Sequence, residues 1–565
     1  MWKDERFRGL SAKDLRQDLV AGMTVGVVAI PLGMAFAIAS GASPESGLYT
    51  TIIAGFIVAL IGGSKFQIAG PTGAFIPILL AIVLQYGFED LLIAGMLAGV
   101  MLIVMSIFKF GSLITYIPRP VTIGFTAGIA VIIFTGQLEN FLGLSGIEKQ
   151  TYFHQNMWEI VKNIGTLNVF SIILALIGLF TLRIIPKFFQ RVPVLLVALI
   201  VPTVISVFIM PGKVETIGSA FGGISQALPK FTVPNITFEK LLYLWQPAFA
   251  IAMLGGIESL LSAVVADGMT GKRHQSNKEL FGQGVANIVT PFFGGIPATG
   301  AIARTATNIK SGARSPFSGI FQSVFVLLTV LLFAPFAAYI PLASMAPILM
   351  VVAFNMSEHK TFKSILLLRN SDSLVLVTTF LLTVFVNLTI AVPIGLLLAM
   401  VSFVRRISGM LDVQKIKTEQ LGEEEDQTYR CPKIASFTVH GPLFFGAADR
   451  FASTLSASIR QRPNVLILKM RHVSLIDATG EANLATFVKD FIAKGGTVLI
   501  TELHEEPMTI LRQSGLAEAI GEEHFFSDTT KAINYALGRV DVTKCIHCQK
   551  VGATSCRVFK QLETE

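Results

Sequence analysis

Long apolar runs separated by short charged turns fill the chain up to about residue 410. A helix needs about 20 apolar residues to cross a bilayer, and most of the runs approach that length. The pattern therefore predicts a polytopic α-helical membrane protein with about fourteen transmembrane helices. The runs lie at residues 18–40, 47–63, 72–87, 91–109, 118–137, 168–184, 192–210, 243–266, 278–293, 299–311, 316–335, 338–355, 372–388 and 390–408.

Positive charges gather in the turns on one side of these runs when the N-terminus is placed inside. Cytoplasmic loops carry an excess of Lys and Arg, so this bias sets the topology. With an even number of spans, we expect both termini to be cytoplasmic and the protein to lie in the cell membrane. The cytoplasmic cations are Lys65, Lys109, Arg183, Lys187, Arg191, Lys272, Arg273, Lys310, Arg314, Lys360, Lys363, Arg369, Arg405 and Arg406, whereas the outer side receives Glu89, Asp90 and the loops 138–166 and 211–241.

Two short runs, beginning near residues 72 and 299, resemble each other. The first lies in GGSKFQIAGPTGAF (Gly62–Phe75) and the second in GGIPATGAIARTATN (Gly294–Asn308). Each has a Gly-Gly pair, then a Pro, then Thr-Gly-Ala, and by the span count they enter the membrane from opposite sides. Short segments interrupted by Gly and Pro, at corresponding positions of two inverted halves, are typical of a transporter's binding site.

Helices that begin inside a membrane leave backbone N–H groups without partners, which is costly unless the groups face water or a ligand. A helix N-terminus also carries about half a positive charge. The starts at Thr72-Gly73 and Thr299-Gly300 would point at each other, so an anion fits between them. The alternative is that these Gly and Pro residues only kink helices or let them pack, as is common in membranes.

Glu258 lies well inside an apolar run and is the only carboxylate that we identify within a span. Such a group marks a functional site by default, and burial favours its protonated form, so it is a candidate carrier of a coupling proton. Ser262 lies one turn later on the same face. Arg304, about one turn into the second short helix, could neutralise Glu258 as a static ion pair or add positive charge beside the anion. Packing hydrogen bonds also explain Ser262 and Asn308.

The sequence after Arg406 is polar and predicts a soluble domain behind a charged linker. Alternating β and α patterns indicate a parallel sheet covered by helices. We expect a cytoplasmic N-terminal segment at 1–17, a transport domain at 18–410, a linker at 411–430, an α/β domain at 431–541 and a cysteine-containing tail at 542–565. Within the soluble domain we expect strands at 433–441, 464–470 and 497–503 and helices at 447–460, 479–494, 507–515 and 529–537.

Composition and charge exclude several classes of protein. Of the 565 residues 52% are hydrophobic and 15% charged, with a mean hydropathy of +0.65, whereas soluble domains carry about 25% charged residues. The net charge of +8 comes from cations that flank apolar runs, which argues against a nucleic-acid partner. Four cysteines, none before residue 431, exclude a secreted disulfide framework, and the polar N-terminus does not read as a signal peptide. No GxxxxGK[ST] loop supports an ATP-driven pump.

Two further motifs lie in the soluble part. Thr479 in Asp477-Ala478-Thr479-Gly480 is a candidate regulatory residue, although a plain helix N-cap explains the motif as well. Cys545, His547, Cys548 and Cys556 supply up to four soft ligands, but their spacing is incomplete. They are weak candidates for a metal site, and unpaired, reduced cysteines are the alternative, so we predict no metal and no cofactor.

These segments together resemble the sulfate permease (SulP) family, which includes the solute carrier 26 anion transporters. The resemblance is carried by Ile30–Thr50, Gly62–Phe75, the Glu258 segment, Asn287–Asn308 and a C-terminal domain similar to STAS. It implies fourteen spans in two inverted repeats of seven, a core domain that moves like an elevator against a gate domain, and a homodimer. It also implies anion binding at Thr72, Gly73, Ala74, Thr299, Gly300 and Ala301, with Phe36 lining the pocket.

The resemblance implies proton coupling through Glu258, because it links Glu at this position with proton coupling, whereas a sodium-coupled bicarbonate group carries Asp there. In STAS relatives of the anti-sigma type, the motif is Asp-Ser-Ser/Thr-Gly with a phosphorylated hydroxyl, and here only Thr479 keeps one. We predict a secondary transporter, not an enzyme, which carries small oxyanions together with protons, sulfate first. The alternatives are a sodium-coupled bicarbonate symporter, a dicarboxylate symporter for fumarate or succinate, an anion channel or exchanger, and a membrane-tethered regulator with a cytosolic partner at the STAS domain.

Overall fold

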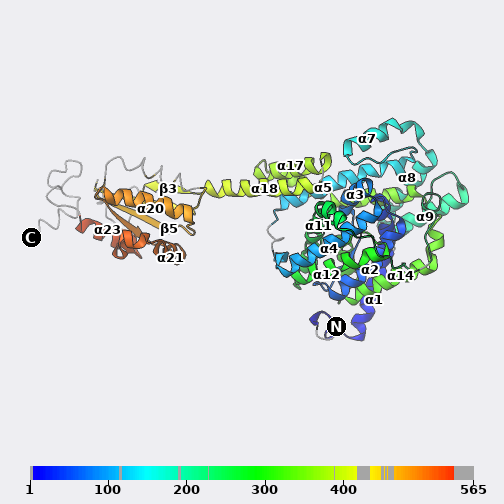
Figure 1. Cartoon of the computed structure of the whole chain (residues 1–565), viewed down its shortest axis with the longest axis horizontal. Coiled ribbons are helices and arrows are strands. Elements are labelled where there is room, and N and C mark those ends of the chain that lie inside the picture. Colours follow the sequence, from blue (N-terminus) through cyan, green and yellow to red (C-terminus); the bar gives the residue numbers. More distant parts are fainter. Residues whose placement is uncertain are drawn as a thin grey trace, which may run out of the picture. The chain divides into compact units, whose positions relative to one another are not determined.

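The computed structural model describes residues 4–112, 117–188, 193–226, 228–386, 388–415, 433–446, 451, 455 and 463–539. It divides into two units, residues 1–399 and 400–565 (Figure 1). The first unit is helical, and the second contains a five-stranded sheet. This division follows the change in composition near Arg406, where apolar runs give way to polar sequence.

The first half of the helical unit holds a short strand among its helices. Its α-helices and its strand are α1 (Ala12–Ala39), α2 (Pro44–Ile61), β1 (Ala69–Gly70), α3 (Ile76–Tyr86), α4 (Phe88–Ile107), α5 (Arg119–Gly136), α6 (Leu138–Leu142), α7 (Phe153–Lys162), α8 (Val169–Phe188) and α9 (Val194–Ile209). Short 3₁₀ helices lie at Glu5–Phe7, Gly73–Phe75 and Ile164–Thr166.

The second half repeats the order of a short strand followed by a short helix. Its elements are α10 (Ile217–Phe221), α11 (Phe238–Thr270), α12 (Ser276–Val289), a 3₁₀ helix at Thr290–Phe293, β2 (Thr299–Gly300), α13 (Ile302–Lys310), α14 (Phe317–Ala337), α15 (Leu342–Met356), α16 (His359–Leu367), α17 (Ser371–Phe385) and α18 (Leu388–Ser408). Because β1 and β2 pair antiparallel, the two corresponding segments run in opposite directions.

Every predicted apolar run contains a helix, but the helices differ in length. Among the described residues, eight helices are long and apolar enough to cross a membrane. Three more are apolar but shorter, and α13 has only nine residues. The helical membrane fold is thus as predicted, whereas the count of fourteen spans stays a prediction.

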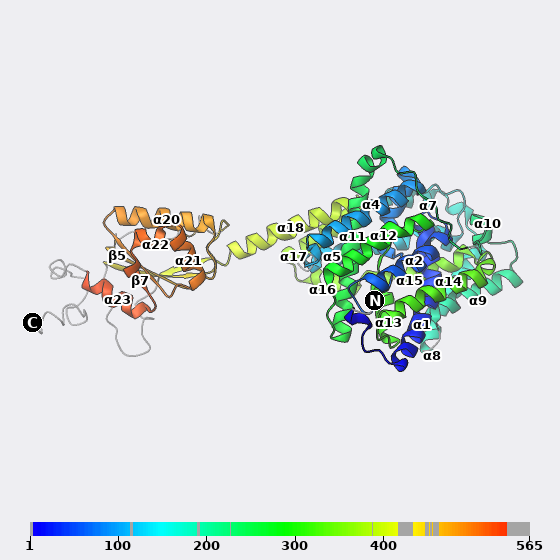
Figure 2. The ribbon, with the colours of Figure 1, turned by 60° about the horizontal axis from the view of Figure 1, so that its bottom comes forward.

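The contacts between helices define two groups, and Figure 2 labels most of their members. In one group α1 contacts α2 and α14, and α4 contacts α11 and α12; we call it the core domain. In the other, which we call the gate domain, α5 contacts α15 and α17, and α8 contacts α9 and α15. Helix α1 also reaches α9 and α15, so it lies where the two groups meet.

Glycines let the core helices approach closely. A Cβ atom at Gly284 of α12 would lie 2.7 Å from the carbonyl oxygen of Gly99 on α4, and one at Gly47 of α2 would overlap the carbonyl oxygen of Gly33 on α1. Apolar side chains gain little by packing on each other in lipid, so small residues that let backbones meet stabilise such pairs. The Gly-rich composition of the runs therefore explains the tight core.

The second unit is an α/β domain with the strand order β3-β4-β5-β6-β7. Its strands are β3 (Asp412–Lys415), β4 (Ile434–His440), β5 (Val465–His472), β6 (Thr497–Thr501) and β7 (Phe525–Phe526), and its described helices are α20 (Ala478–Ala493), α21 (Glu505–Gln513), α22 (Leu516–Ile520) and α23 (Thr529–Gly538). Strands β4 to β7 are parallel, and β3 is antiparallel to β4. Helices cover both faces of β5, which explains its buried run Val465–Leu468.

Two details of the soluble domain differ from the expectation. Residues Asp412–Lys415, assigned to the linker, form an edge strand, because their backbone pairs with Phe437–His440. Strand β7 and helix α22 were not expected, since both are too short to leave a pattern in the sequence. Most of the predicted helix 447–460 lies outside the described residues, and its two described residues, Phe451 and Leu455, are buried in the core.

Candidate functional site

The two Thr-Gly-Ala segments come together in the core domain. Strands β1 and β2 pair in antiparallel register, with Ala69 opposite Gly300 and Gly70 opposite Thr299. A short helix follows each strand, α3 after a 3₁₀ turn at Gly73–Phe75 and α13 directly after Ala301. Two helix N-termini therefore lie next to each other although about 230 residues separate them in the chain.

Polar groups of the second segment are largely engaged within the core. The Gly300 N–H donates to Oγ of Ser259 at 2.9 Å, and the Thr299 hydroxyl donates to the Gly255 carbonyl at 3.0 Å. The Ala301 N–H donates to the Ile68 carbonyl at 2.8 Å. These bonds hold the strand pair against α11. The N–H groups of Gly300 and Ala301 are consequently occupied by protein acceptors.

The donors that remain on this side belong to the start of α13. The first N–H groups of a helix have no carbonyl partner within the helix. Ile302 and Ala303 begin α13 and are exposed, whereas Arg304 behind them is buried. An anion on this side would thus meet the N–H groups of the first turn of α13, slightly further along the chain than the sequence predicts.

On the other side, Gly73 and Ala74 form the 3₁₀ turn that leads into α3. The hydroxyl of Thr72 donates to Oε2 of Glu258 at 2.9 Å. Phe36 lies against the turn, because a Cβ atom at Gly73 would be 3.5 Å from its Cε1 atom. Phe36, Thr72, Gly73 and Glu258 are therefore brought together as one cluster at the N-terminus of α3.

Glu258 differs from Asp18 and Glu279, two other carboxylates of the predicted runs. It is partly exposed, and Thr72 is its one hydrogen-bond donor among the described residues. The expectation that it is the only carboxylate within a span is wrong, because Asp18 and Glu279 lie in predicted runs and are fully buried. Both of these accept backbone N–H bonds that stabilise their charge, whereas Glu258 is partly exposed and accepts a side-chain hydroxyl.

Asp18 and Glu279 fasten loops to the core. Glu279 accepts the N–H groups of Gly63 and Ser64 at 2.7 and 3.1 Å. Asp18 accepts the N–H groups of Arg314 and Ser315 at 2.6 and 3.1 Å. Both groups are buried charges with several donors, as a stable fold requires. These contacts explain why Asp18 and Glu279 are buried, and both carboxylates stabilise the fold.

Arg304 is buried against the first strand. It is 2% exposed, its Nη2 donates to the Pro71 carbonyl, and its Nη1 has no partner among the described residues. A Cβ atom at Gly70 would lie 2.7 Å from that Nη1. No nitrogen of Arg304 lies within 4 Å of the Glu258 carboxylate, so within the described core the two do not form the contact ion pair that was one alternative.

Ser262 and Asn308 make hydrogen bonds within the scaffold. The Ser262 hydroxyl donates to Oγ1 of Thr305 at 3.2 Å. The Asn308 amide donates to the Phe66 carbonyl at 3.0 Å and to Oγ of Ser318 at 2.8 Å. These contacts agree with the packing explanation, and a role of Ser262 in coupling stays a prediction.

Several residues of the site were missed in the sequence. Gln67 donates to the Ser259 carbonyl at 3.0 Å, and the Asn287 amide makes two bonds to Ala298, each of 2.8 Å. Polar side chains inside apolar segments were the signal that could have found them. Ile133 and Met356 lie within 3.3 Å of a Cβ atom built at Gly73, but they come from gate helices and carry no sequence signal.

In the soluble domain Asp477 caps helix α20. Its Oδ1 accepts the Gly480 N–H at 2.7 Å, and its Oδ2 accepts the N–H of Phe445 at 2.9 Å. Thr479 is exposed in the first turn of the helix. The N-cap explanation of this motif thus has direct contacts, and a regulatory role of Thr479 stays a prediction. Cys545, His547, Cys548 and Cys556 lie outside the described residues.

A charged cluster lies at the ends of strands β5 and β6. Glu502 accepts hydrogen bonds from Thr529 at 2.7 Å and from Lys469 at 3.1 Å. Partial burial alone would raise the pKa of Glu502. The bonds from Thr529 and Lys469 and the charge of Arg471 outweigh that effect, so the pKa of this carboxyl lies below its ordinary value.

Comparisons with known proteins agree with this architecture. Residues 15–379 match the sulfate permease family, and residues 427–532 match the STAS domain. A Bacillus subtilis protein named "Putative sulfate transporter YvdB" is 51% identical over 522 residues, which cover 92% of this chain and 98% of that protein.

Two solved structures are similar as well. The transmembrane domain of a cyanobacterial bicarbonate transporter, BicA, is 31% identical, with a TM-score of 0.61, 69% of this chain and 98% of that chain covered. The overall structure of SLC26A9 is 20% identical and shares the fold, with a TM-score of 0.82 over 95% of this chain and 92% of that chain. The chain is therefore a multi-pass membrane protein of the sulfate permease family and carries a C-terminal STAS domain.

Proposed function

We propose that this protein is a proton-coupled secondary transporter of small oxyanions, with sulfate as the first candidate. It acts in the cell membrane with both termini in the cytoplasm and works as a homodimer. The name of the Bacillus subtilis relative supports sulfate, and the lysines and arginines of the cytoplasmic turns support the orientation.

The observation that carries this proposal is the pair of helix starts at Gly73 and Ile302 in the middle of the core domain. First-turn N–H groups lack helical partners, and the dipole of each helix adds positive potential. The buried guanidinium of Arg304 lies behind the strand pair and adds a full charge. An oxyanion between the two helix starts can accept hydrogen bonds from the backbone N–H groups of both.

The contact between Thr72 and Glu258 supports proton coupling. Ionised Glu258 holds the hydroxyl beside the first helix start and places a negative charge near the anion. Protonation removes this charge, so that the anion and the proton favour each other's binding. The anion then crosses in company with a proton.

The packing of helices supports an elevator motion. The site belongs to the core domain, since β1 contacts α2, α3 contacts α4, and both β2 and α13 contact α11. Side chains of α5 and α15 of the gate touch it. A core domain that slides past the gate carries the whole site with it, because the strand pair and its hydrogen bonds stay intact.

Bicarbonate is the second candidate, and the likeness to the BicA transmembrane domain favours it. In this second candidate function, sodium replaces the proton as the coupling ion. The two anions differ in size and charge, but backbone N–H groups receive both. Dicarboxylates such as fumarate and succinate are the remaining substrates to compare.

Uptake of labelled anions into proteoliposomes tests the proposal. We expect accumulation of sulfate that an inward proton gradient drives and a sodium gradient does not. Bicarbonate uptake driven by sodium would replace the proposal with the second candidate. Flux far above the turnover of carriers would indicate a channel, and no flux of any of the four anions would refute transport by this site.

A further inference from the structure

A cavity of about 430 Å³ runs along helix α3 beside the site. One wall follows α3 from Ile76 in its first turn to Gln85 near its end. The opposite wall comes from the gate domain and includes Ile133 of α5. Because one wall belongs to the core and the other to the gate, any sliding of the two domains changes the shape of this cavity.

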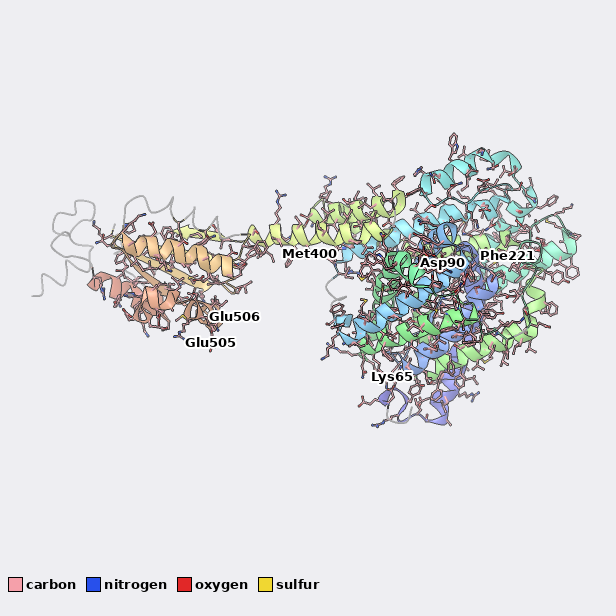
Figure 3. All side chains as sticks on the ribbon, in the orientation of Figure 1. Lys65, Asp90, Phe221, Met400, Glu505 and Glu506 are labelled. Atoms are coloured by element: carbon pink, nitrogen blue, oxygen red, sulfur yellow. The ribbon has the colours of Figure 1, made fainter. Side chains whose placement is uncertain are left out.

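The cavity opens at the end of the domain opposite the N-terminal segment. It contains Ile38 and Ala39 at the far end of α1, and Tyr86, which stacks on Tyr243 at 5.5 Å. The Tyr243 hydroxyl donates to Asp90 at 2.6 Å. In Figure 3 Asp90 lies away from Lys65, which is next to the N-terminal segment. With cytoplasmic termini, the mouth of the cavity therefore faces outside.

The lining changes character along the cavity. Polar groups lie toward the mouth, where Glu139, Lys149 and Asn156 contribute side chains. The inner end is aliphatic and includes Ile76 and Ile133. An anion can enter the polar part with water around it, whereas the aliphatic end offers nothing to replace that water.

The inner end meets the anion site at Gly73. A Cβ atom there would lie 3.0 Å from Sδ of Met356, 3.3 Å from Cδ1 of Ile133 and 3.5 Å from Cε1 of Phe36. Ile133 is 1% exposed and Phe36 5%, so these side chains fill the space in front of the helix start. Two of the three, Ile133 and Met356, belong to gate helices α5 and α15.

We propose that the cavity is the outer access route to the anion site and that Ile133 and Met356 are the barrier that closes it. The inference rests on the proposed function for the identity of the permeant. An apolar contact stops an ion because it excludes water. Since the contact joins core to gate without any hydrogen bond, a sliding motion opens it at small cost, and the strand pair beneath is undisturbed.

Cysteine labelling in whole cells tests the route, because residues 1–430 contain no cysteine. The full chain, with its native cysteines changed to serine, receives Gln85→Cys in the cavity wall. A charged, membrane-impermeant thiol reagent added outside should label it. Val100→Cys is the matched control, since Val100 is 47% exposed on α4 but does not line the cavity. Equal labelling of both, or of neither, overturns the route.

The barrier is tested with a reporter on its inner side. Ala303 is exposed at the start of α13, and Ala303→Cys should react slowly with the reagent added outside. Combining it with Ile133→Ala and Met356→Ala should speed this reaction about tenfold or more. A tenfold change in rate corresponds to about 1.4 kcal/mol in the free energy of opening the barrier. Ile133→Val should give a smaller increase and guards against misfolding of the double variant. An unchanged rate in both backgrounds overturns the barrier. Labelling does not require transport. A negative labelling result therefore refutes the access route, and a negative uptake result refutes the proposed function.

Discussion

Replacing Glu258 with Gln tests the coupling proposal most directly. The amide has nearly the same shape as the carboxyl, and its oxygen still accepts the Thr72 hydroxyl that now lies 2.9 Å from Oε2. The change removes the ability to ionise and leaves the helix starts in place. We expect the variant to behave as a transporter with its proton permanently bound.

The size of the effect follows from the geometry of the cluster. Thr72 contacts the carboxylate, and the N–H of the next residue, Gly73, begins the helix turn, so a bound anion lies on the order of 6 Å from the carboxylate. Two like charges at that distance repel by about 3 kcal/mol at an effective dielectric constant of about 20. This corresponds to roughly a hundredfold change in affinity. Anion affinity of the wild type should therefore weaken by up to that factor as Glu258 ionises, and that of the variant should not.

Two measurements on proteoliposomes check this reasoning. Equilibrium binding or exchange of labelled anion should persist in Glu258→Gln, while accumulation in response to an inward proton gradient should disappear. Glu279→Gln is the matched control, because Glu279 is a buried carboxylate held by the N–H groups of Gly63 and Ser64. Its free energy of unfolding should fall by about 1.5–3 kcal/mol, which lowers its unfolding temperature. Its anion accumulation should still respond to a proton gradient. Accumulation by Glu258→Gln under a proton gradient would refute the coupling role.

Further predictions concern the glycines and the soluble domain. Gly73→Ala should fold and slow transport, because its Cβ contacts apolar side chains that can move. Gly300→Ala should lower stability, because its Cβ would displace the buried Gln67 amide from the Ser259 carbonyl; thermal unfolding and uptake separate the two. The fragment 411–541, which retains β3, should fold alone, with circular dichroism of a folded α/β domain; a random-coil spectrum would contradict this. In that fragment Asp477→Ala should cost about 1 kcal/mol in urea unfolding through loss of the N-cap. The lowered pKa of Glu502 stabilises the domain above pH 4.5, so this contribution is lost as the pH falls below that value, and Glu502→Gln should show a flatter acid limb.

The hydrophobic pattern by itself determined the membrane class and the order of the elements. Apolar runs of spanning length give helices because no other continuous structure satisfies its own backbone in lipid. The repeated Thr-Gly-Ala segments indicated where two helices begin inside the membrane, and both begin within three residues of the expected place. The alternating pattern after Arg406 likewise predicted the parallel sheet of the soluble domain.

The tertiary structure decided which groups at those helix starts are free. The N–H groups of Gly300 and Ala301 are occupied by Ser259 and by Ile68, and Arg304 binds the Pro71 carbonyl instead of Glu258. Strand β3 and the contacts of Met356 at Gly73 were equally invisible in the pattern. Local sequence fixes where a helix starts, since capping and breaking act over a few residues. The acceptors of the Gly300 and Ala301 N–H groups lie 41 and about 230 residues away in the chain, and only the packed chain brings those segments together.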